Sequence, residues 1–309
     1  MTYASDLKDF DDLVRATAAD IGLPPDAVEK DYYVVRALQV LQGELAGRFL
    51  FKGGTSLSKG WGLIDRFSED IDLLFRREHQ GEPVGTKAMD RLLKQAQDAV
   101  GNAPGFTLKD SKASKGLRRA SSFVYPRQHK AVAPIGDTVL LEMGCRGGTQ
   151  PSQHRAIRAF VTGFLEKRGE TGIAGDLTAF EVECLDVTRT FVEKLFAVCA
   201  AFARDRCTGR TRHYYDLYQL AELPQVKDFL QSTLYAEVYS DVRVFSEEHW
   251  TGSVYPPERN AGECAALTPT GDALAELTRN YARERDLFFK EPPLMKVILE
   301  RLQGLPFPA

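Results

Sequence analysis

The sequence has few cysteines and no pattern that would join them. The five cysteines among 309 residues are widely separated, and none forms a Cys-x-x-Cys pair. An odd number of scattered cysteines favours reduced thiols over a disulfide framework or a zinc site. The five histidines also lack the spacing of metal ligands. We therefore expect a protein of a reducing compartment whose chemistry does not depend on cysteine or histidine ligands.

Long apolar runs and a surplus of positive charge are missing as well. No apolar run is long enough to cross a bilayer, and the N-terminal residues are acidic where a targeting signal would be basic. The net charge is −3, so nucleic-acid binding would have to come from local basic segments. Hydrophobic residues make up 43% and charged residues 27%, as in globular proteins. We expect a cytoplasmic protein without a membrane partner.

A P-loop is absent too, although one stretch comes close to it. The motif requires Gly-x-x-x-x-Gly-Lys followed by Ser or Thr. Counting from Gly53, Lys59 occupies the lysine position, but Ser58 replaces the second glycine and Gly60 replaces the final Ser or Thr. Two required positions fail, which excludes a P-loop NTPase.

The same stretch contains a glycine turn after an apolar run. Residues 49–51 are Phe-Leu-Phe, and residues 53–56 are Gly-Gly-Thr-Ser. Paired glycines allow a sharp turn that brings N–H groups close to a ligand. Thr55 and Ser56 suit a helix N-cap, where an anion is favoured, and Lys59 would share a helix face with Thr55. We predict a turn that binds phosphates.

Residues 66–75 read as a strand that carries two carboxylates. Because side chains alternate along a strand, Ser68, Asp70 and Asp72 share one face and the intervening apolar residues share the buried one. The two aspartates are about 6.6 Å apart along the strand at a rise of about 3.3 Å per residue. Such a pair beside a phosphate-binding turn suits Mg²⁺, which prefers oxygen ligands and substrate phosphates. The alternative is a glycine-rich hairpin with two solvated aspartates.

Together the turn and the strand resemble a known signature. Gly-Gly-Thr-x-Leu-x-Lys followed by Arg-Phe-Ser-x-Asp-Ile-Asp-Leu is similar to the nucleotidyltransferase signature of the polymerase-β superfamily. In detail it resembles the AbiEii/AbiGii family, the toxin half of bacterial toxin–antitoxin and abortive-infection pairs. The resemblance implies an α/β (α+β) fold with a polymerase-β-type nucleotidyltransferase core, a mixed sheet and a mainly helical C-terminal lobe.

The polar, glycine-rich segment 166–176 is the best domain boundary in the sequence. We expect a nucleotidyltransferase core with N-terminal helices over residues 1–170. Residues 171–309 would then form a mainly helical domain that closes the cleft.

The resemblance also implies a two-metal site with a third carboxylate from a later strand. Residues 137–145 read as an apolar strand whose one carboxylate is Glu142, so two Mg²⁺ ions would be held by Asp70, Asp72 and Glu142. The alternative for Glu142 is a salt bridge to a neighbouring arginine. The residues expected to bind the nucleotide phosphates are Gly53, Gly54, Thr55, Ser56, Lys59, Arg66, Ser68 and Lys194.

Two catalytic residues in the second half follow from the resemblance. Lys194 lies in an Arg-Thr-Phe-x-Glu-Lys-Leu run, and in the family this lysine faces the nucleotide site. Asp216 lies in an Arg-His-x-x-Asp-Leu-Tyr pattern and would orient Lys194 or bridge to the site. The alternatives are a surface lysine and a helix-surface ion pair between Asp216 and Arg212. Near the N-terminus, Lys30 and Asp31 are expected to form an exposed charged pair.

Two basic segments are candidates for nucleic-acid binding. Residues 107–130 combine lysines and arginines with aromatic residues and read as two strands joined by a turn, which suits a nucleic-acid backbone. The alternative is a hairpin whose lysines protect a sheet edge. A second basic loop covers residues 204–212. The candidates are Lys112, Lys115, Arg118, Arg119, Arg206 and Arg210.

These features lead to one functional hypothesis with two alternatives. We expect a Mg²⁺-dependent nucleotidyltransferase toxin that transfers NMP from an NTP to an RNA acceptor, the tRNA 3′ end by the resemblance, and so blocks translation. The resemblance implies an antitoxin as protein partner. The alternatives are a nucleotidyltransferase that modifies a protein or small molecule, and a degenerate nucleotide-binding partner protein.

Overall fold

The alternating apolar segments in the first two thirds of the chain form one mixed sheet. Within the part of the chain that the structure describes, its seven strands lie in the order β5-β6-β7-β2-β1-β9-β8. The pairs β2–β7 and β1–β9 are parallel, whereas β1–β2, β5–β6 and β6–β7 are antiparallel. The strands are β1 (Phe49–Lys52), β2 (Asp70–Phe75), β5 (Thr107–Ser114), β6 (Arg118–Val124), β7 (Val139–Gly144), β8 (Ser152–Ile157) and β9 (Phe180–Leu185).

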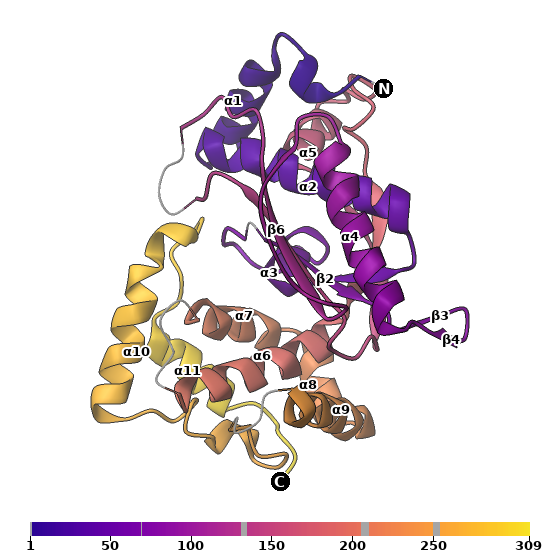
Figure 1. Cartoon of the computed structure of the whole chain (residues 1–309). Coiled ribbons are helices and arrows are strands. Elements are labelled where there is room, and N and C mark those ends of the chain that lie inside the picture. The colour runs from indigo at the N-terminus through magenta and orange to yellow at the C-terminus, as the bar shows by residue number, and fades with distance from the viewer. Residues whose placement is uncertain (1, 69, 131–134, 205–209, 250–253) are drawn as a thin grey trace. The chain divides into compact units, whose positions relative to one another are not determined.

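The computed structural model describes residues 2–68, 70–130, 135–204, 210–249 and 254–309 (Figure 1). These form two compact units, Met1–Gly62 with Phe67–Cys184, and Leu63–Arg66 with Leu185–Ala309. The sequence places the boundary at 170/171, whereas the structure places it at 184/185. The reason is that β9 pairs with β1 and so completes the sheet of the first unit.

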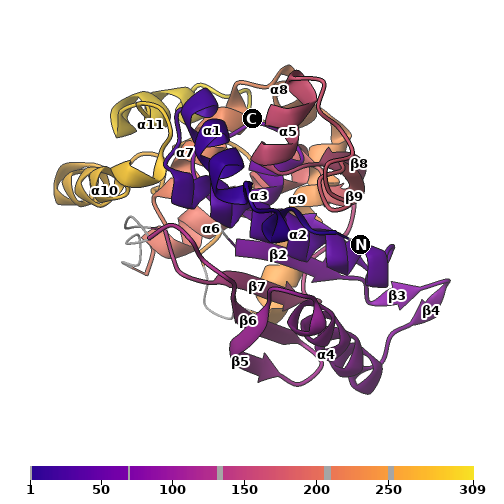
Figure 2. The same ribbon diagram turned by 90° about the horizontal axis from the view of Figure 1, so that it is seen from above.

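Helices cover the apolar face of the sheet in the first unit. Ile71 and Leu141 on that face belong to one core with apolar residues of α2 and α4. Seen from above, α1, α2 and α5 group together (Figure 2). The helices of this unit are α1 (Phe10–Ile21), α2 (Pro25–Leu45), α3 (Gly53–Lys59), α4 (Thr86–Asn102) and α5 (Phe160–Lys167), with the short 3₁₀ helix η1 (Ala4–Asp6) and the small ribbon β3 (Glu78–His79) with β4 (Glu82–Pro83).

The described part of the second unit is helical. Its helix α6 packs against α7, α8 and α9, and α11 packs against α7. The bounds are α6 (Val187–Phe202), α7 (Arg212–Ala221), α8 (Pro224–Leu230), α9 (Thr233–His249), α10 (Gly271–Arg283) and α11 (Met295–Gln303), with the 3₁₀ helices η2 (Ala261–Glu263) and η3 (Arg285–Leu287).

The mixed α/β architecture confirms the predicted fold class, and the helical second unit fits the predicted C-terminal lobe. Within the described residues, no helix has both the length and the apolar composition needed to cross a membrane.

Candidate active site

The glycine turn and the second aspartate of the strand form one structural feature. Gly53 joins β1 to α3 with a φ of 78°, in the left-handed region that favours glycine. A Cβ atom on Gly53 would lie 2.0 Å from Oδ2 of Asp72. The missing side chain therefore allows the Asp72 carboxylate to lie directly against the turn.

The prediction that Thr55 and Ser56 cap a helix is wrong. The sharp turn occurs at Gly53, so α3 begins there and both residues lie inside it with buried side chains. The Thr55 hydroxyl donates to the carbonyl oxygen of Asp70 at 2.6 Å, and it lies 2.9 Å from Oγ of Ser68. Ser56 packs beside the thiol of Cys184. The Thr55 hydroxyl therefore connects α3 to β2 in the sheet of the first unit.

The third carboxylate lies on the strand next to the two aspartates. Parallel pairing of β2 with β7 makes Asp72 and Glu142 direct partners, and it pairs Asp70 with Leu140. Direct partners on neighbouring strands share a face. Asp70, Asp72 and Glu142 therefore share the half-exposed face of the sheet, while the side chains between them are buried.

The Glu142 carboxylate is turned toward an arginine. Arg118 on β6 lies 2.7 Å from Oε1 of Glu142, so the salt bridge considered as an alternative is present. Both side chains are at least one third exposed, and such pairs contribute less than about 1 kcal/mol. Within the described residues, no three His, Cys, Asp or Glu side chains are grouped closely enough to hold a metal ion. The strand register brings the carboxylates to one face, but their side chains do not converge.

Lys59 is paired inside the first unit. Its ammonium forms a buried ion pair with Asp31 of α2 and lies 3.3 Å from the centroid of the Phe160 ring. The other carboxylate oxygen of Asp31 accepts the backbone N–H of Phe160 at 2.7 Å. Burial raises the pKa of Asp31 and lowers the pKa of Lys59. The attraction between the two charges opposes both shifts but is the smaller effect.

The prediction that Lys30 and Asp31 form an exposed charged pair is therefore wrong. Both are buried, because α2 lies in the core and each side chain has its own partner. Lys30 donates to the carbonyl oxygen of Gly136 at 2.9 Å, and Asp31 holds Lys59.

The predicted residues Arg66, Lys194 and Asp216 meet in the second unit. Arg66 donates from Nε and Nη2 to the two carboxylate oxygens of Asp216, each at 2.7 Å. Lys194 of α6 lies 2.7 Å from Oδ2 of the same carboxylate. Although burial opposes ionisation, Arg66 and Lys194 hold the pKa of Asp216 well below its usual value. Asp216 is fully buried, which rules out a helix-surface pair with Arg212.

His213 belongs to this cluster and was not singled out from the sequence. Its Nδ1 lies 3.3 Å from Nζ of Lys194. Burial and the charge of Lys194 lower the pKa of His213 to about 4, so the imidazole is neutral near pH 7 and Nδ1 accepts from the ammonium. The signal that could have indicated it is the Arg-His-x-x-Asp pattern, which places His213 three residues before Asp216 on the same face of the helix.

The basic hairpin divides between the two faces of the sheet. Direct pairing places Lys112 of β5, Ala120 of β6, Glu142 and Asp72 in one row across four strands. Arg118 lies two residues before Ala120 and so shares this face.

Arg119 points to the opposite face, where it donates to Gln97 of α4 at 3.2 Å. Lys115 lies exposed in the turn between β5 and β6, and Arg210 is exposed just before α7. Arg206 lies outside the described residues. Because β5 is an edge strand, the protective role of its lysines also fits the structure.

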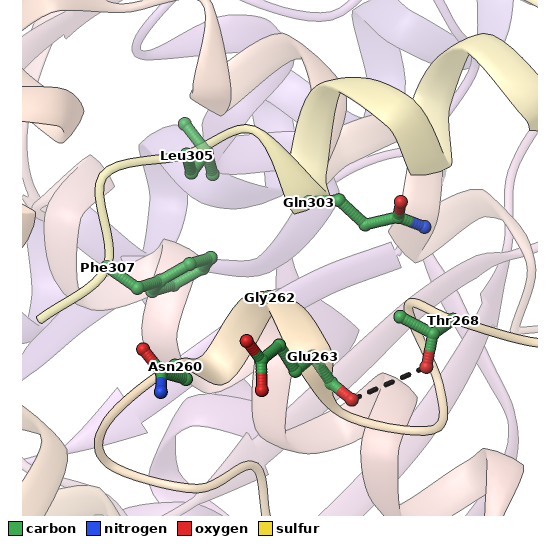
Figure 3. Close-up of a pocket in the computed structure, with 7 residues that line it drawn as sticks. All are labelled: Asn260, Gly262, Glu263, Thr268, Gln303, Leu305 and Phe307. Carbon is green, nitrogen blue, oxygen red and sulfur yellow. Dashed lines mark hydrogen bonds between the residues drawn. The ribbon is translucent and has the colours of Figure 1, made fainter. Parts of the chain in front are cut away.

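A cavity of about 210 Å³ lies in the second unit and contains none of the predicted site residues. Figure 3 shows its lining, drawn from the segment around η2 and from the C-terminal residues.

Comparisons with known proteins agree with this fold. The family model described as nucleotidyl transferase AbiEii toxin, type IV TA system, matches residues 36–303. A search of the curated proteins gave no match. Among solved structures, the chain is similar to MenT4, a nucleotidyltransferase toxin from Mycobacterium tuberculosis H37Rv, at 16% identity and a TM-score of 0.53. The similarity covers 94% of this chain and 98% of that chain, and at this identity it shows a shared fold.

The family match spans most of the chain and includes the turn, the aspartate strand, Glu142, Lys194 and Asp216. The chain therefore belongs to the AbiEii family of nucleotidyltransferase toxins of type IV toxin–antitoxin systems.

Proposed function

We propose that the chain transfers NMP from an NTP to an RNA acceptor, the 3′ end of tRNA, with a divalent metal at Asp70, Asp72 and Glu142. The observation that carries the proposal is the register of β2 and β7, which makes Asp72 and Glu142 direct partners. The family supplies the reaction class and an NTP as substrate. Our proposal adds to these the metal, the RNA acceptor and the resulting block of translation.

The donor atoms on this face fit Mg²⁺. All three side chains are carboxylates, and a hard cation with substrate phosphates prefers oxygen ligands. When bound, divalent ions would neutralise charge on the transferring phosphoryl group and activate the acceptor hydroxyl. Asp70 and Asp72 come from one strand face and Glu142 from the adjacent strand, so a change of the Glu142 rotamer away from Arg118 would bring it toward them.

The residues proposed for the phosphates form a smaller set than the sequence suggested. Gly53 lies against Asp72, and we retain the backbone N–H groups of Gly53 and Gly54 at the start of α3 as the proposed phosphate-binding part of the turn. The hydroxyl of Thr55 is engaged by the strand backbone, and Arg66 is engaged by Asp216. Thr55 therefore contributes by holding the turn, and Arg66 contributes by holding Asp216 beside Lys194.

Lys194 is proposed to place its charge on the triphosphate, with Asp216 as a positioning residue. A buried lysine beside one carboxylate and a neutral histidine has a fixed ammonium position. A point charge at a fixed position suits the β- and γ-phosphates of a nucleotide.

The acceptor is proposed from the basic residues on the carboxylate face. Lys112 and Arg118 share that face with Asp72 and Glu142. Neither the strand register nor the charges point to a base-reading contact, so this face would bind the RNA backbone. Positive charge next to a carboxylate cluster favours a polyanionic acceptor over a neutral small molecule.

The family also implies an antitoxin as partner. We propose that the antitoxin restrains this transfer, as expected for the toxin half of an abortive-infection pair.

The decisive experiment supplies each labelled NTP, Mg²⁺ and total RNA to the purified chain. We expect label in RNA, and loss of at least about 100-fold in rate in Asp72→Asn, the scale reached when a transition-state stabiliser is removed. Glu181→Gln, an exposed carboxylate on β9 of the same sheet, is the matched control and should keep the rate.

The other outcomes decide against parts of the proposal. Label only in protein would support modification of a protein instead of RNA. Nucleotide binding without transfer to any acceptor would support a degenerate partner protein. Full transfer in the presence of a chelator would remove the metal from the proposal.

A further inference from the structure

Two cysteines of the second unit lie in contact although they are far apart in the sequence. Sγ of Cys199 on α6 lies 3.4 Å from Sγ of Cys264, which follows η2. A disulfide requires an S–S distance of about 2.05 Å, so the two sulfurs would have to approach by about 1.4 Å. A change of that size lies within reach of small side-chain rotations.

Cys264 begins a turn with a dense set of hydrogen bonds. Its carbonyl oxygen accepts from the backbone N–H groups of Leu267 and Thr268 at 2.8 and 3.0 Å. The Thr268 hydroxyl also lies 3.1 Å from this oxygen and bonds to the carbonyl of Glu263, as Figure 3 shows. This turn holds Cys264 in place opposite Cys199.

We propose that Cys199 and Cys264 form a modification site, in which a peroxide oxidises Cys264 and Cys199 resolves the product as an intramolecular disulfide. The proposal rests on the contact between the two sulfurs and on the turn around Cys264. It is independent of nucleotidyl transfer.

The two thiols differ in a way that assigns their roles. Cys264 is partly exposed, whereas Cys199 is buried. Hydrogen bonds from Cys199 and from the backbone of the turn lower the pKa of Cys264, and the same contact together with burial raises the pKa of Cys199. The thiolate is the reactive form of cysteine. Cys264 is therefore the attacking residue and Cys199 the resolving one.

The chemistry balances with the peroxide as the two-electron oxidant. The Cys264 thiolate attacks one peroxide oxygen, the O–O bond breaks, and an S–O bond forms to give a sulfenic acid. The departing hydroxide takes up the proton that Cys264 released and leaves as water. The Cys199 sulfur then attacks the Cys264 sulfur, the S–S bond forms and the S–O bond breaks. The second hydroxide leaves as water with the proton of Cys199.

The other described cysteines provide internal controls. Cys145 and Cys184 lie buried in the first unit, and burial raises the pKa of Cys184 to about 11. Neither should react with peroxide in the folded chain. Cys207 lies outside the described residues, so the experiment must identify the paired cysteines and not only count thiols.

The test treats the reduced full-length chain with hydrogen peroxide, blocks free thiols, and maps peptides by mass spectrometry without reduction. We expect a peptide that joins Cys199 to Cys264 and is lighter than the two reduced peptides by two hydrogen atoms. A thiol reductant should remove it. Absence of this peptide, or a dominant disulfide that contains Cys207, would overturn the proposal.

Single variants separate the two roles. In Cys199→Ser the sulfenic acid on Cys264 has no resolving thiol, so dimedone should label Cys264 and the cross-linked peptide should be lost. In Cys264→Ser, dimedone should label neither position. Cys184→Ser should retain the cross-link. Labelling of Cys199 by dimedone in Cys264→Ser would reverse the assignment of the two roles. If circular dichroism shows that Cys199→Ser is unfolded, Cys199→Ala takes its place.

Discussion

Asp72 and Glu142 are direct partners in the parallel pairing of β2 with β7. This relationship places a carboxylate from a later strand on the same sheet face as the two aspartates of the signature. Gly53 lies against Asp72 from the other side, so the turn and the carboxylates form a single local structure in the first unit.

Glu142→Gln should lower kcat for nucleotidyl transfer by about 100-fold or more, because it removes the charge of the third carboxylate. Its stability in urea should change by less than about 1 kcal/mol, because the Arg118–Glu142 pair is exposed. Arg118→Gln breaks the same pair and keeps the carboxylate, so it should raise KM for RNA and leave kcat near the original value. Equal losses of kcat in both variants would mean that the ion pair itself matters.

Gly53→Ala should abolish transfer, because its Cβ would overlap the Asp72 carboxylate and displace it. Gly62→Ala is the matched control: Gly62 also has a positive φ, of 65°, but a Cβ there meets nothing within 4 Å. Both variants should lose about 1–2 kcal/mol of stability from the left-handed backbone. Only Gly53→Ala should lose activity, measured at a temperature where both are folded. Comparable activity in the two variants would show that Asp72 tolerates displacement.

Asp31→Asn should lower the free energy of unfolding by about 3–5 kcal/mol, because it leaves the buried Lys59 without its carboxylate. The double variant Asp31→Asn with Lys59→Met removes both charges and should recover most of that loss in urea denaturation. If the double variant is as unstable as the single one, then the loss comes from the hydrogen bond to Phe160 and not from the ion pair.

His213 should make the chain less stable as the pH falls from about 6.5 to about 4. Its folded pKa of about 4 lies below the usual value of 6.5, so in this window the unfolded chain binds a proton that the folded chain does not. The effect is at most about 3.4 kcal/mol, since the pKa differs by about 2.5 units and each unit corresponds to about 1.36 kcal/mol.

Urea denaturation at pH 4.5 and 7 checks this prediction. His213→Asn should lose less stability between the two pH values than the unmodified chain does. His154 is exposed, so His154→Asn should lose as much stability as the unmodified chain. An unchanged difference in His213→Asn would assign the acid sensitivity to other groups.

Lys112→Glu should weaken RNA binding and reduce its salt dependence by about one unit of slope, the effect expected for one lost phosphate contact. Arg119→Gln is the comparison, because Arg119 lies on the opposite sheet face against Gln97. Filter-binding titrations with tRNA at several salt concentrations measure both slopes. A similar decrease in the two variants would mean that RNA does not distinguish the faces.

Local periodicity was sufficient for the elements that build the first half of the site. The alternation of aspartates and apolar residues over residues 70–73 predicted a strand with both carboxylates on one face, because alternation along a strand needs no information from distant residues. The same reasoning placed β7 around Glu142 and the helix that carries Lys194. It missed α5, α8 and α9, although their buried residues do recur at helical spacing, as Tyr235, Val238, Tyr239 and Val242 do in α9.

The sequence by itself determined the family signature, the glycine turn and the strand with two aspartates. Only the tertiary structure decided that Glu142 pairs with Asp72, that Lys59 is held by Asp31, and that Arg66 is committed to Asp216. The contact between Cys199 and Cys264 likewise appears only in the folded chain. The physical reason is that strand order and buried ion pairs depend on contacts between distant segments, and short-range patterns do not encode which segments meet.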